Sequence, residues 1–372
     1  MKYFIMPADF KTETLDKYDE LNKNYNDSKV IETYGQISLG TFFESGRNIL
    51  EVPKVDFDRL KSYVEYSRKK GIDFNYTFNA SYMNNKEFSK EGIANITSFL
   101  TRLYEIGIDS LTIALPSVIE LVGSLKLRFK IKASTICQIN NASKAMYYKN
   151  MGVERIVVDE SVHRDFETLK RIREAFGSKV EVIANTICHK HCIYRMFHYN
   201  EEAGDSFKVV NEASATYFIN RCVMRKFDSL GNLLKISWIR PEDIKFYTGI
   251  GINYFKIQGR QFMEHGRDPV KAVKHYMEES YDGSFFELLD LFLNPDGNTH
   301  PRIENKLLDG FINVFVENPG FCKNDCGNCG YCDNFAKRFA TDKVLKANES
   351  LKKLHQRRDA YTKMLALLTN EK

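Results

Sequence analysis

The sequence has no long hydrophobic run, either at its start or later. Its most apolar later stretch, LTIALPSVIELVG, is too short to span a bilayer and contains Pro116 and Glu120. The opening residues, MKYFIMPADFKTETLDKYDE, lack the apolar core and small-residue cleavage site of a signal peptide. We therefore expect a cytoplasmic protein without a membrane span.

The sequence also lacks a strong excess of one charge. It contains 54 basic and 49 acidic residues, which are interspersed, so the net charge is only +5. This balance permits RNA binding without favouring it, because the chain has no strongly basic stripe and no recognisable RNA-binding module. We therefore favour a small-molecule substrate over RNA.

Motifs of several well-known enzyme classes are missing. No GxGxxG follows the first expected strand, so a dinucleotide site is not supported. Neither GxSxG nor HExxH occurs, which argues against an α/β-hydrolase and against a zinc protease of that type. The eight cysteines are the more informative residues, because in a reducing compartment clustered cysteines favour metal binding or redox chemistry over disulfides.

Short runs of β-branched and aromatic residues recur through the first 260 residues. Helix-like stretches with apolar positions three and four residues apart separate several of them. Eight strands alternating with helices predict an α/β fold, a TIM-like (β/α)8 barrel over residues 1–295, with a doubly wound open sheet as the alternative. The runs are KYFIM, KVIETYG, DFNYTFN, SLTIA, RFKIKAST, ERIVVDE, KVEVIAN and NYFKIQG.

The regular spacing is interrupted at about residues 186–250. The insertion holds NTICHKHCIYRMFHYN, YFINRC and WIRPEDI, and it is far longer than an ordinary loop of such a barrel. In a barrel it would lie over the C-terminal face, where active sites are built. Residues 296–372 form a separate C-terminal segment, with four clustered cysteines followed by a charged helix from about Asp342 to the end.

The clustered cysteines lie within FCKNDCGNCGYC. Gaps of two or three residues allow a tight loop to turn several thiolates toward one centre, and Gly327 and Gly330 permit the left-handed turns that this requires. The compressed run resembles ferredoxin segments and favours a [4Fe-4S] cluster, with structural Zn as the alternative. The four are Cys322, Cys326, Cys329 and Cys332.

The other four cysteines are scattered, but each comes after an expected strand. Cys137 follows KIKAST, Cys188 and Cys192 follow VEVIAN, and Cys222 ends YFINRC. Because the loops after barrel strands project from one face, these sulfurs could converge there and hold a second [4Fe-4S] cluster. For Cys137 the alternative is a small buried hydrophobic residue.

Histidines beside these cysteines leave a further alternative open. His189 and His191 in CHKHC suit Zn, although residues so close in sequence cannot all point at one metal. His198, in RMFHYN, is a candidate catalytic residue, and its alternative is a histidine satisfied within the core.

The order of these motifs resembles peptidase family U32. NTICHKHCIYRMFHYN, then NRC, then WIRPEDIKFYTGIGINYFKIQGR are similar to the family's cysteine-bearing segment, RPEDL-like turn and KI-GR strand. KASTICQINNASKAMYYKNMGVERIVVDE resembles an earlier strand, helix and strand of the family. The resemblance implies a TIM-like barrel with a [4Fe-4S] cluster. It also implies an oxygen-independent hydroxylase acting on a small aromatic molecule or a nucleic-acid base, with prephenate as oxygen donor; peptidase activity is the older assignment.

Cluster ligands can be carried over from the family only in part. The resemblance makes Cys188, Cys192 and Cys222 ligands, with Cys137 or a non-cysteine group as the fourth. The CxxxC of Cys188 and Cys192 replaces the family's usual spacing of six, and the C-terminal four-cysteine run is absent from its better known branches. This departure indicates a little characterised subfamily, in which fold and cluster carry over better than substrate.

Three cations complete the candidate site. Arg240, Lys256 and Arg260 follow or end late strands and would bind a dicarboxylate such as prephenate. For Arg240 the alternative is an ion pair with Glu242 or Asp243. The C-terminal cluster would then act as an electron relay served by an electron-donor protein. Two other functions stay open: a U32-type peptidase, and a zinc-stabilised binding protein without catalysis.

Overall fold

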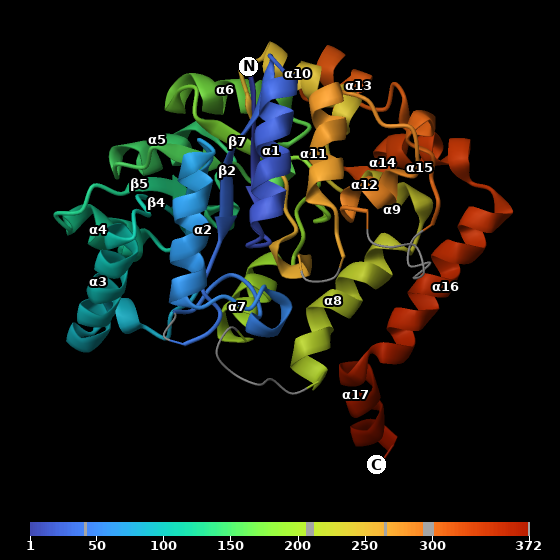
Figure 1. The fold of residues 1–372 in the computed structure, drawn as a ribbon. Coiled ribbons are helices and arrows are strands. Elements are labelled where there is room, and N and C mark those ends of the chain that lie inside the picture. Colours follow the sequence, from blue (N-terminus) through green and yellow to red (C-terminus); the bar gives the residue numbers. More distant parts are fainter. Residues whose placement is uncertain (41–42, 206–211, 264–265, 293–300, 371–372) are drawn as a thin grey trace.

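The computed structural model describes residues 1–40, 43–205, 212–263, 266–292 and 301–370. Within these ranges eight parallel strands pair in sequence order and close into a barrel (Figure 1). The predicted (β/α)8 fold is confirmed, and each of the eight sequence runs falls on one strand. The strands are β1 (Lys2–Pro7), β2 (Ser28–Gly35), β3 (Asp73–Phe78), β4 (Ser110–Ile113), β5 (Lys130–Ala133), β6 (Arg155–Val157), β7 (Val180–Ile183) and β8 (Tyr254–Lys256).

The barrel interior contains a layer of paired charges. Lys132 forms ion pairs with Glu32 and, at 3.0 Å, with Glu181, and all three side chains are buried. They come from β5, β2 and β7, which are not neighbours in the sheet, so the contacts cross the inside of the barrel. Because each charge has a partner of opposite sign, the layer can be buried without leaving an uncompensated ion.

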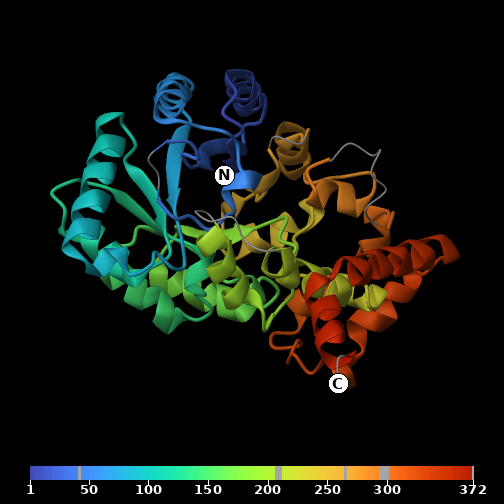
Figure 2. The ribbon, with the colours of Figure 1, turned by 90° about the horizontal axis from the view of Figure 1, so that it is seen from below.

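Helices cover the outside of the barrel (Figures 1 and 2). Five of them begin where a side chain accepts a hydrogen bond from the first turn, which satisfies an otherwise unpaired N–H. These capping residues are Asp56, Ser89, Asn141, Asp165 and Asp268. None of the helices in the described ranges is both long enough and apolar enough to cross a membrane. The outer helices are α1 (Thr12–Asn24), α2 (Phe57–Lys69), α3 (Lys90–Glu105), α4 (Pro116–Ser124), α5 (Ala142–Asn150), α6 (Phe166–Phe176) and α11 (Pro269–Glu278).

The predicted insertion lies between β7 and β8 and is helical. It contains α7 (Arg195–Asp205), α8 (Glu212–Lys226), α9 (Leu230–Leu234) and α10 (Ile244–Gly249). The expectation of a strand ending at Cys222 was wrong, because residues 217–222 belong to α8. The reason is tertiary: α8 packs along the C-terminal helices, where Asn220 Nδ2 donates to Arg358 O at 3.3 Å. Such packing overrides the β-branched and aromatic composition of YFINRC.

The C-terminal segment wraps around this insertion (Figures 1 and 2). Phe311, Phe335 and Phe339 belong to one buried apolar cluster with Trp238 of the insertion. The predicted boundary between residues 295 and 296 lies outside the described residues. The single expected C-terminal helix is two helices, because the Asp359 side chain caps the second by accepting from the N–H of Thr362. α12 (Phe285–Leu289) precedes the segment, and the helices of the segment are α13 (Asn313–Glu317), α14 (Cys326–Cys329), α15 (Tyr331–Ala336), α16 (Asp342–Arg358) and α17 (Ala360–Asn370).

Candidate functional site

A cavity of about 340 Å³ opens at the C-terminal end of the barrel. Tyr34, Thr77 and Lys256 reach it from strands β2, β3 and β8, and Glu160 and Cys188 reach it from the segments after β6 and β7. A second cavity of about 350 Å³ shares part of its wall. Catalytic residues of (β/α)8 barrels come from the C-terminal ends of several strands, so this is the candidate active site.

Two of the scattered cysteines line this cavity. Cys188 comes from the loop after β7 and Cys222 from α8, and both are half-buried. Burial, together with the nearby negative charge of Glu160, raises the pKa of the Cys188 thiol to about 12. A thiol with so high a pKa is a poor nucleophile at neutral pH, whereas a bound metal ion would displace its proton.

The other two predicted ligands of this set do not line the cavity. Cys192 is half-buried and lies four residues beyond Cys188 on the same loop. Cys137 Sγ lies 3.3 Å from the backbone oxygen of Ala114, and burial raises the pKa of this thiol to about 11. The structure thus places Cys188 and Cys222 on one cavity, Cys192 on the adjoining loop, and Cys137, also half-buried, after β5 and beside the backbone of Ala114.

Four cations line the cavity. The Arg260 side chain is the most enclosed: the residue is 5% exposed, and its guanidinium donates to the side chains of Gln36 and Thr77. Arg47 Nε donates to Gln261 Oε1 at 3.3 Å from the long loop after β2. Cations converging on a largely buried space favour an anionic ligand, because few water molecules screen them there. The four are Arg47, Lys226, Lys256 and Arg260.

Lys256 differs from the other cations in its protonation. Burial lowers the pKa of Lys256 to about 7, although Glu181 acts in the opposite direction. Its Nζ lies 4.0 Å from the centre of the Tyr34 ring at the cavity wall. An amine that titrates near neutral pH can both accept and release a proton, which is what general acid–base catalysis requires.

His198 also faces the cavity, from the first turn of α7. Its Nε2 lies 3.3 Å from Glu202 Oε1, one helical turn further on, and its ring stacks on Phe218 at a centroid distance of 5.7 Å. Burial raises the pKa of Glu202, but the hydrogen bond from His198 and the charge of Arg47 outweigh it and lower the pKa. His198 is therefore held by a carboxylate at the cavity wall, as a proton-transferring histidine would be.

One acidic residue of the cavity wall is paired with an arginine. Glu160 Oε2 lies 2.9 Å from Arg195 Nη1, which also lies 2.7 Å from Asp159 Oδ2. Burial raises the pKa of Glu160, while Arg195 acts against that rise. Glu51 and Glu202 line the cavity too, so its wall carries carboxylates as well as cations.

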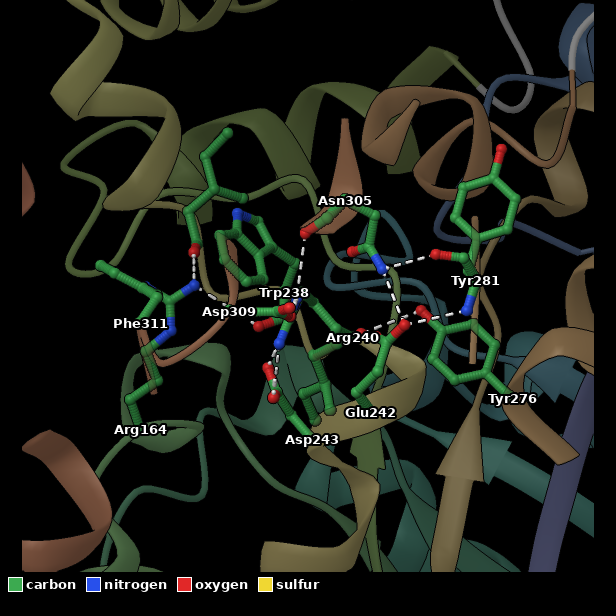
Figure 3. A network of polar contacts seen from close by, with 12 residues as sticks. Arg164, Trp238, Arg240, Glu242, Asp243, Tyr276, Tyr281, Asn305, Asp309 and Phe311 are labelled. Carbon is green, nitrogen blue, oxygen red and sulfur yellow. Dashed lines mark hydrogen bonds and ion pairs between the residues drawn. The ribbon is translucent and has the colours of Figure 1, made fainter. Parts of the chain in front are cut away.

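Arg240 lies outside the cavity, in a network that joins the insertion to the C-terminal segment (Figure 3). Its Nε lies 3.1 Å from Asp243 Oδ2 and its Nη1 2.8 Å from Asp309 Oδ1. A third bond runs from Nη1 to the backbone oxygen of Asn305 at 3.0 Å. The residue is 3% exposed. This placement corresponds to the structural alternative for Arg240, an ion pair with Asp243, and not to a contact with a ligand in the cavity.

The four C-terminal cysteines line a separate, much smaller hollow of about 30 Å³. Cys326 and Cys329 are exposed on α14, whereas Cys322 and Cys332 are half-buried. Gly330 follows α14 with a φ of 60°, the left-handed conformation expected from the sequence. The backbone reversal allows cysteines on both sides of it to face one hollow.

The donor types at both places fit a metal centre, but neither is a preformed cage. Among the described residues no three His, Cys, Asp or Glu side chains are already grouped around one metal position. The C-terminal hollow offers four thiols, the full ligand set of a [4Fe-4S] cluster or of structural Zn. The barrel cavity offers two thiols, with a third on the adjoining loop, so a [4Fe-4S] cluster there needs a fourth ligand from outside the cavity lining.

Sequence reasoning missed several residues of the cavity wall. Glu202 carried a usable indication, because it lies four residues after His198 and so shares its helical face. Glu160 ends the run ERIVVDE and would follow a barrel strand. Arg47 carried none, since its position depends on contacts between the loop after β2 and the segment after β8.

Comparisons with known proteins agree with this architecture. The model of Peptidase family U32 matches residues 51–285. An uncharacterized protease of Methanocaldococcus jannaschii is 28% identical over 339 residues, covering 89% of this chain and 96% of the relative. The structure of the U32 peptidase Mk0906 superposes with a TM-score of 0.51 at 12% identity, covering 70% of this chain and 93% of that one, which supports the fold alone. The clustered cysteines lie outside the range matched by the family model.

Proposed function

Because the chain belongs to peptidase family U32, as its motifs predicted, we propose that it is an iron–sulfur oxidoreductase that acts on a small anionic molecule at the barrel mouth. The observation that carries the proposal is that one cavity is lined by two cysteines, Cys188 and Cys222, and by two of the cations, Arg260 and Lys256. Thiol ligands next to converging cations suit a redox centre placed beside a bound anion.

Cys188, Cys192 and Cys222 would hold the cluster of this site. A [4Fe-4S] cluster bound there would supply electron transfer and, at an iron without a thiolate, an open position for an oxygen-bearing group. The raised pKa of Cys188 fits this role, because ligation replaces the proton that burial otherwise retains. His189 and His191 lie within this loop, between Cys188 and Cys192, and would stay outside the ligand set.

The cations define the class of substrate. Arg260 and Arg47 would bind a carboxylate in bidentate fashion, and Lys256 would add a second positive charge when protonated. A dicarboxylate oxygen donor such as prephenate fits this set, and the aromatic molecule or base to be hydroxylated would occupy the adjoining cavity of about 350 Å³. Lys256 and His198 would move the protons that accompany the reaction.

A peptidase is the second candidate, favoured by the names of the family and of the two relatives described above. Peptide hydrolysis by a cysteine nucleophile needs an activated thiolate. Burial and the charge of Glu160 raise the pKa of the Cys188 thiol, which disfavours the thiolate. A cavity of about 340 Å³ holds a small molecule better than an extended peptide. These two properties make redox chemistry the stronger proposal.

The C-terminal cysteines would form an accessory metal site. The hollow of about 30 Å³ has room for a metal centre but not for a substrate beside it. As a cluster the site would relay electrons from a donor protein to the barrel; as Zn it would fix the segment structurally.

One preparation separates these functions. The protein is purified without oxygen and its iron, acid-labile sulfide and zinc per chain are measured, together with hydrolysis of a casein substrate and binding of prephenate by calorimetry. We expect iron and sulfide in equal amounts, prephenate binding and no casein hydrolysis. Zinc alone would support the non-catalytic binding protein, and hydrolysis by metal-free protein would support the peptidase.

A further inference from the structure

The loop that carries Cys188 and Cys192 also contacts the C-terminal cysteine site. Lys190, midway between these two cysteines, places its Nζ 3.5 Å from Cys322 Sγ. Two residues of chain span at most about 7 Å, so the backbone at Cys188 lies within a short distance of a side chain that reaches the other site. The barrel cavity and the C-terminal hollow are therefore neighbours, joined by one loop.

This loop is fixed on its other side by backbone pairing. Ser237 N donates to Cys188 O at 3.3 Å, Lys190 N donates to Lys235 O at 3.4 Å, and His189 forms an antiparallel bridge with Ile236. Hydrogen bonds at Lys190 and at the residues just before it restrict the backbone here, so its ammonium group reaches Cys322 from a defined position.

Residues 235–238 form the strip that pairs with this loop, and a buried arginine binds the backbone of that strip. Arg164 is 7% exposed, and its guanidinium donates to Ile236 O at 2.6 Å and to Trp238 O at 3.4 Å. It lies 4.4 Å from the Trp238 ring and 4.9 Å from the Phe311 ring (Figure 3). The barrel, the strip and the C-terminal segment thus meet at Arg164.

Cations and carboxylates both line the hollow. Lys235 reaches it, but its Nζ lies 3.0 Å from Asp333 Oδ2, so its charge has a partner there. Lys190 differs because its ammonium group lies on the Cys322 sulfur. Four thiolates on a metal carry net negative charge, and hydrogen bonds to the sulfurs are one of the factors that set the reduction potential of a cluster.

We propose that Lys190 is a positioning residue that links the two cysteine sites, binding the Cys322 sulfur of the C-terminal metal centre from within the Cys188–Cys192 loop. The inference rests on the proposed metal at the C-terminal cysteines. Removing a charged hydrogen-bond partner of a metal-bound sulfur disfavours the more negative, reduced state. We expect the equilibrium constant for reduction of this centre to fall about tenfold, which is about 59 mV for one electron.

The test compares Lys190→Met with Lys323→Met. Lys323 is exposed, follows Cys322 directly and also lines the hollow, so its substitution removes an equal charge near the same cysteine without touching the Cys188–Cys192 loop. Both lysine variants are made in the Cys188→Ala/Cys222→Ala background, in which only the C-terminal metal centre should remain. The midpoint potential of that centre is measured by anaerobic redox titration. We expect a decrease in Lys190→Met, a much smaller change in Lys323→Met, and recovery in Lys190→Arg. Equal shifts in the two Met variants would overturn the proposal.

A second readout covers a redox-silent metal. If the purified protein contains only zinc, the proposed oxidoreductase function is wrong. The role of Lys190 at Cys322 is then tested by the rate at which a chelator removes zinc from the C-terminal site. Release about tenfold faster from Lys190→Met than from Lys323→Met supports the link, and equal rates reject it. Hydrogen exchange of residues 186–194 adds a check, because loss of metal in Cys326→Ala/Cys329→Ala should speed exchange in this loop.

Discussion

At the barrel mouth two cysteines share a cavity of about 340 Å³ with four cations, whereas in the C-terminal segment four cysteines surround a hollow of about 30 Å³. The second group is the more conspicuous in the sequence and the more exposed in the structure. The number of sulfurs indicates where the proposed metal would have the fuller set of ligands. Free space and ligand-binding charge indicate where a substrate can be placed, and these are at the barrel.

The same difference separates two arginines that the sequence presented as alike. Arg240 and Arg260 are both buried, but Arg240 is saturated by Asp243 and Asp309, whereas Arg260 donates to the neutral side chains of Gln36 and Thr77 beside the cavity. A buried cation with two carboxylate partners stabilises the fold, and one with neutral partners keeps its charge for a ligand.

The largest effect is expected from Arg240→Met. It leaves Asp243 buried without its cation and removes the tie to the C-terminal segment, so the free energy of unfolding should fall by about 3–5 kcal/mol. Arg302→Met is the control, because its pair with Glu304 is exposed to solvent and contributes little to stability. Urea unfolding measures both. A similar small loss in the two variants would place Arg240 outside the structural network.

Arg260→Met should weaken ligand binding with little loss of stability. Removing one charge-assisted contact costs about 1.5–3 kcal/mol, so the affinity for malonate, a small dicarboxylate probe, should fall about 10- to 100-fold by calorimetry. Arg171→Met, on the outer face of α6 with an exposed partner, should leave malonate binding unchanged. Unchanged binding in Arg260→Met would move the anion site away from the barrel mouth.

Lys256→Met should change the pH dependence of stability. Between about pH 7 and 10.5 the unfolded chain holds a proton that the folded chain has released at Lys256, so this residue makes stability rise with pH across that window. The variant loses this contribution, and its Tm relative to the unsubstituted protein should be highest below pH 7, by at least about 2 °C, and decline toward pH 10. Calorimetry at pH 6, 8 and 9.5 tests the trend. A difference in Tm that does not depend on pH would show that burial does not lower the pKa of Lys256.

Gly330→Ala should have the smallest effect. A β-carbon there would lie 3.5 Å from the Asn334 side chain, which is ordinary contact, so the cost is the left-handed backbone, about 1 kcal/mol. Metal retention in the C-terminal site during dialysis against a chelator should fall while malonate binding persists. If metal retention and malonate binding were lost together, the C-terminal site and the barrel cavity would not be independent of each other.

The sequence predicted the barrel well because its strands are local features. Runs such as KVEVIAN are short and rich in β-branched residues, a composition that favours strands. YFINRC misled because its helical state depends on packing against α16 and α17, more than a hundred residues away. Local composition carries no information about such a contact.

The candidate site was predictable where a residue follows a strand and not where a loop returns to it. Lys256 and Cys188 line the cavity because their strands end there. Arg47 arrives through the loop after β2, and the role of Arg240 depends on Asp309, far along the chain. Contacts between residues far apart in the sequence place Arg47 and join Arg240 to Asp309, whereas the local pair of Arg240 with Asp243 was among the sequence-based alternatives.

The central claim is that the barrel mouth holds its own cluster, apart from the C-terminal cysteines. The most direct measurement is iron per chain in anaerobically purified protein and in two matched variants, Cys188→Ala/Cys222→Ala and Cys326→Ala/Cys329→Ala. Two [4Fe-4S] clusters predict about eight iron atoms per chain, falling to about four in each variant. Iron unchanged in Cys188→Ala/Cys222→Ala, with complete loss in Cys326→Ala/Cys329→Ala, would contradict the account and leave the C-terminal segment as the protein's iron site.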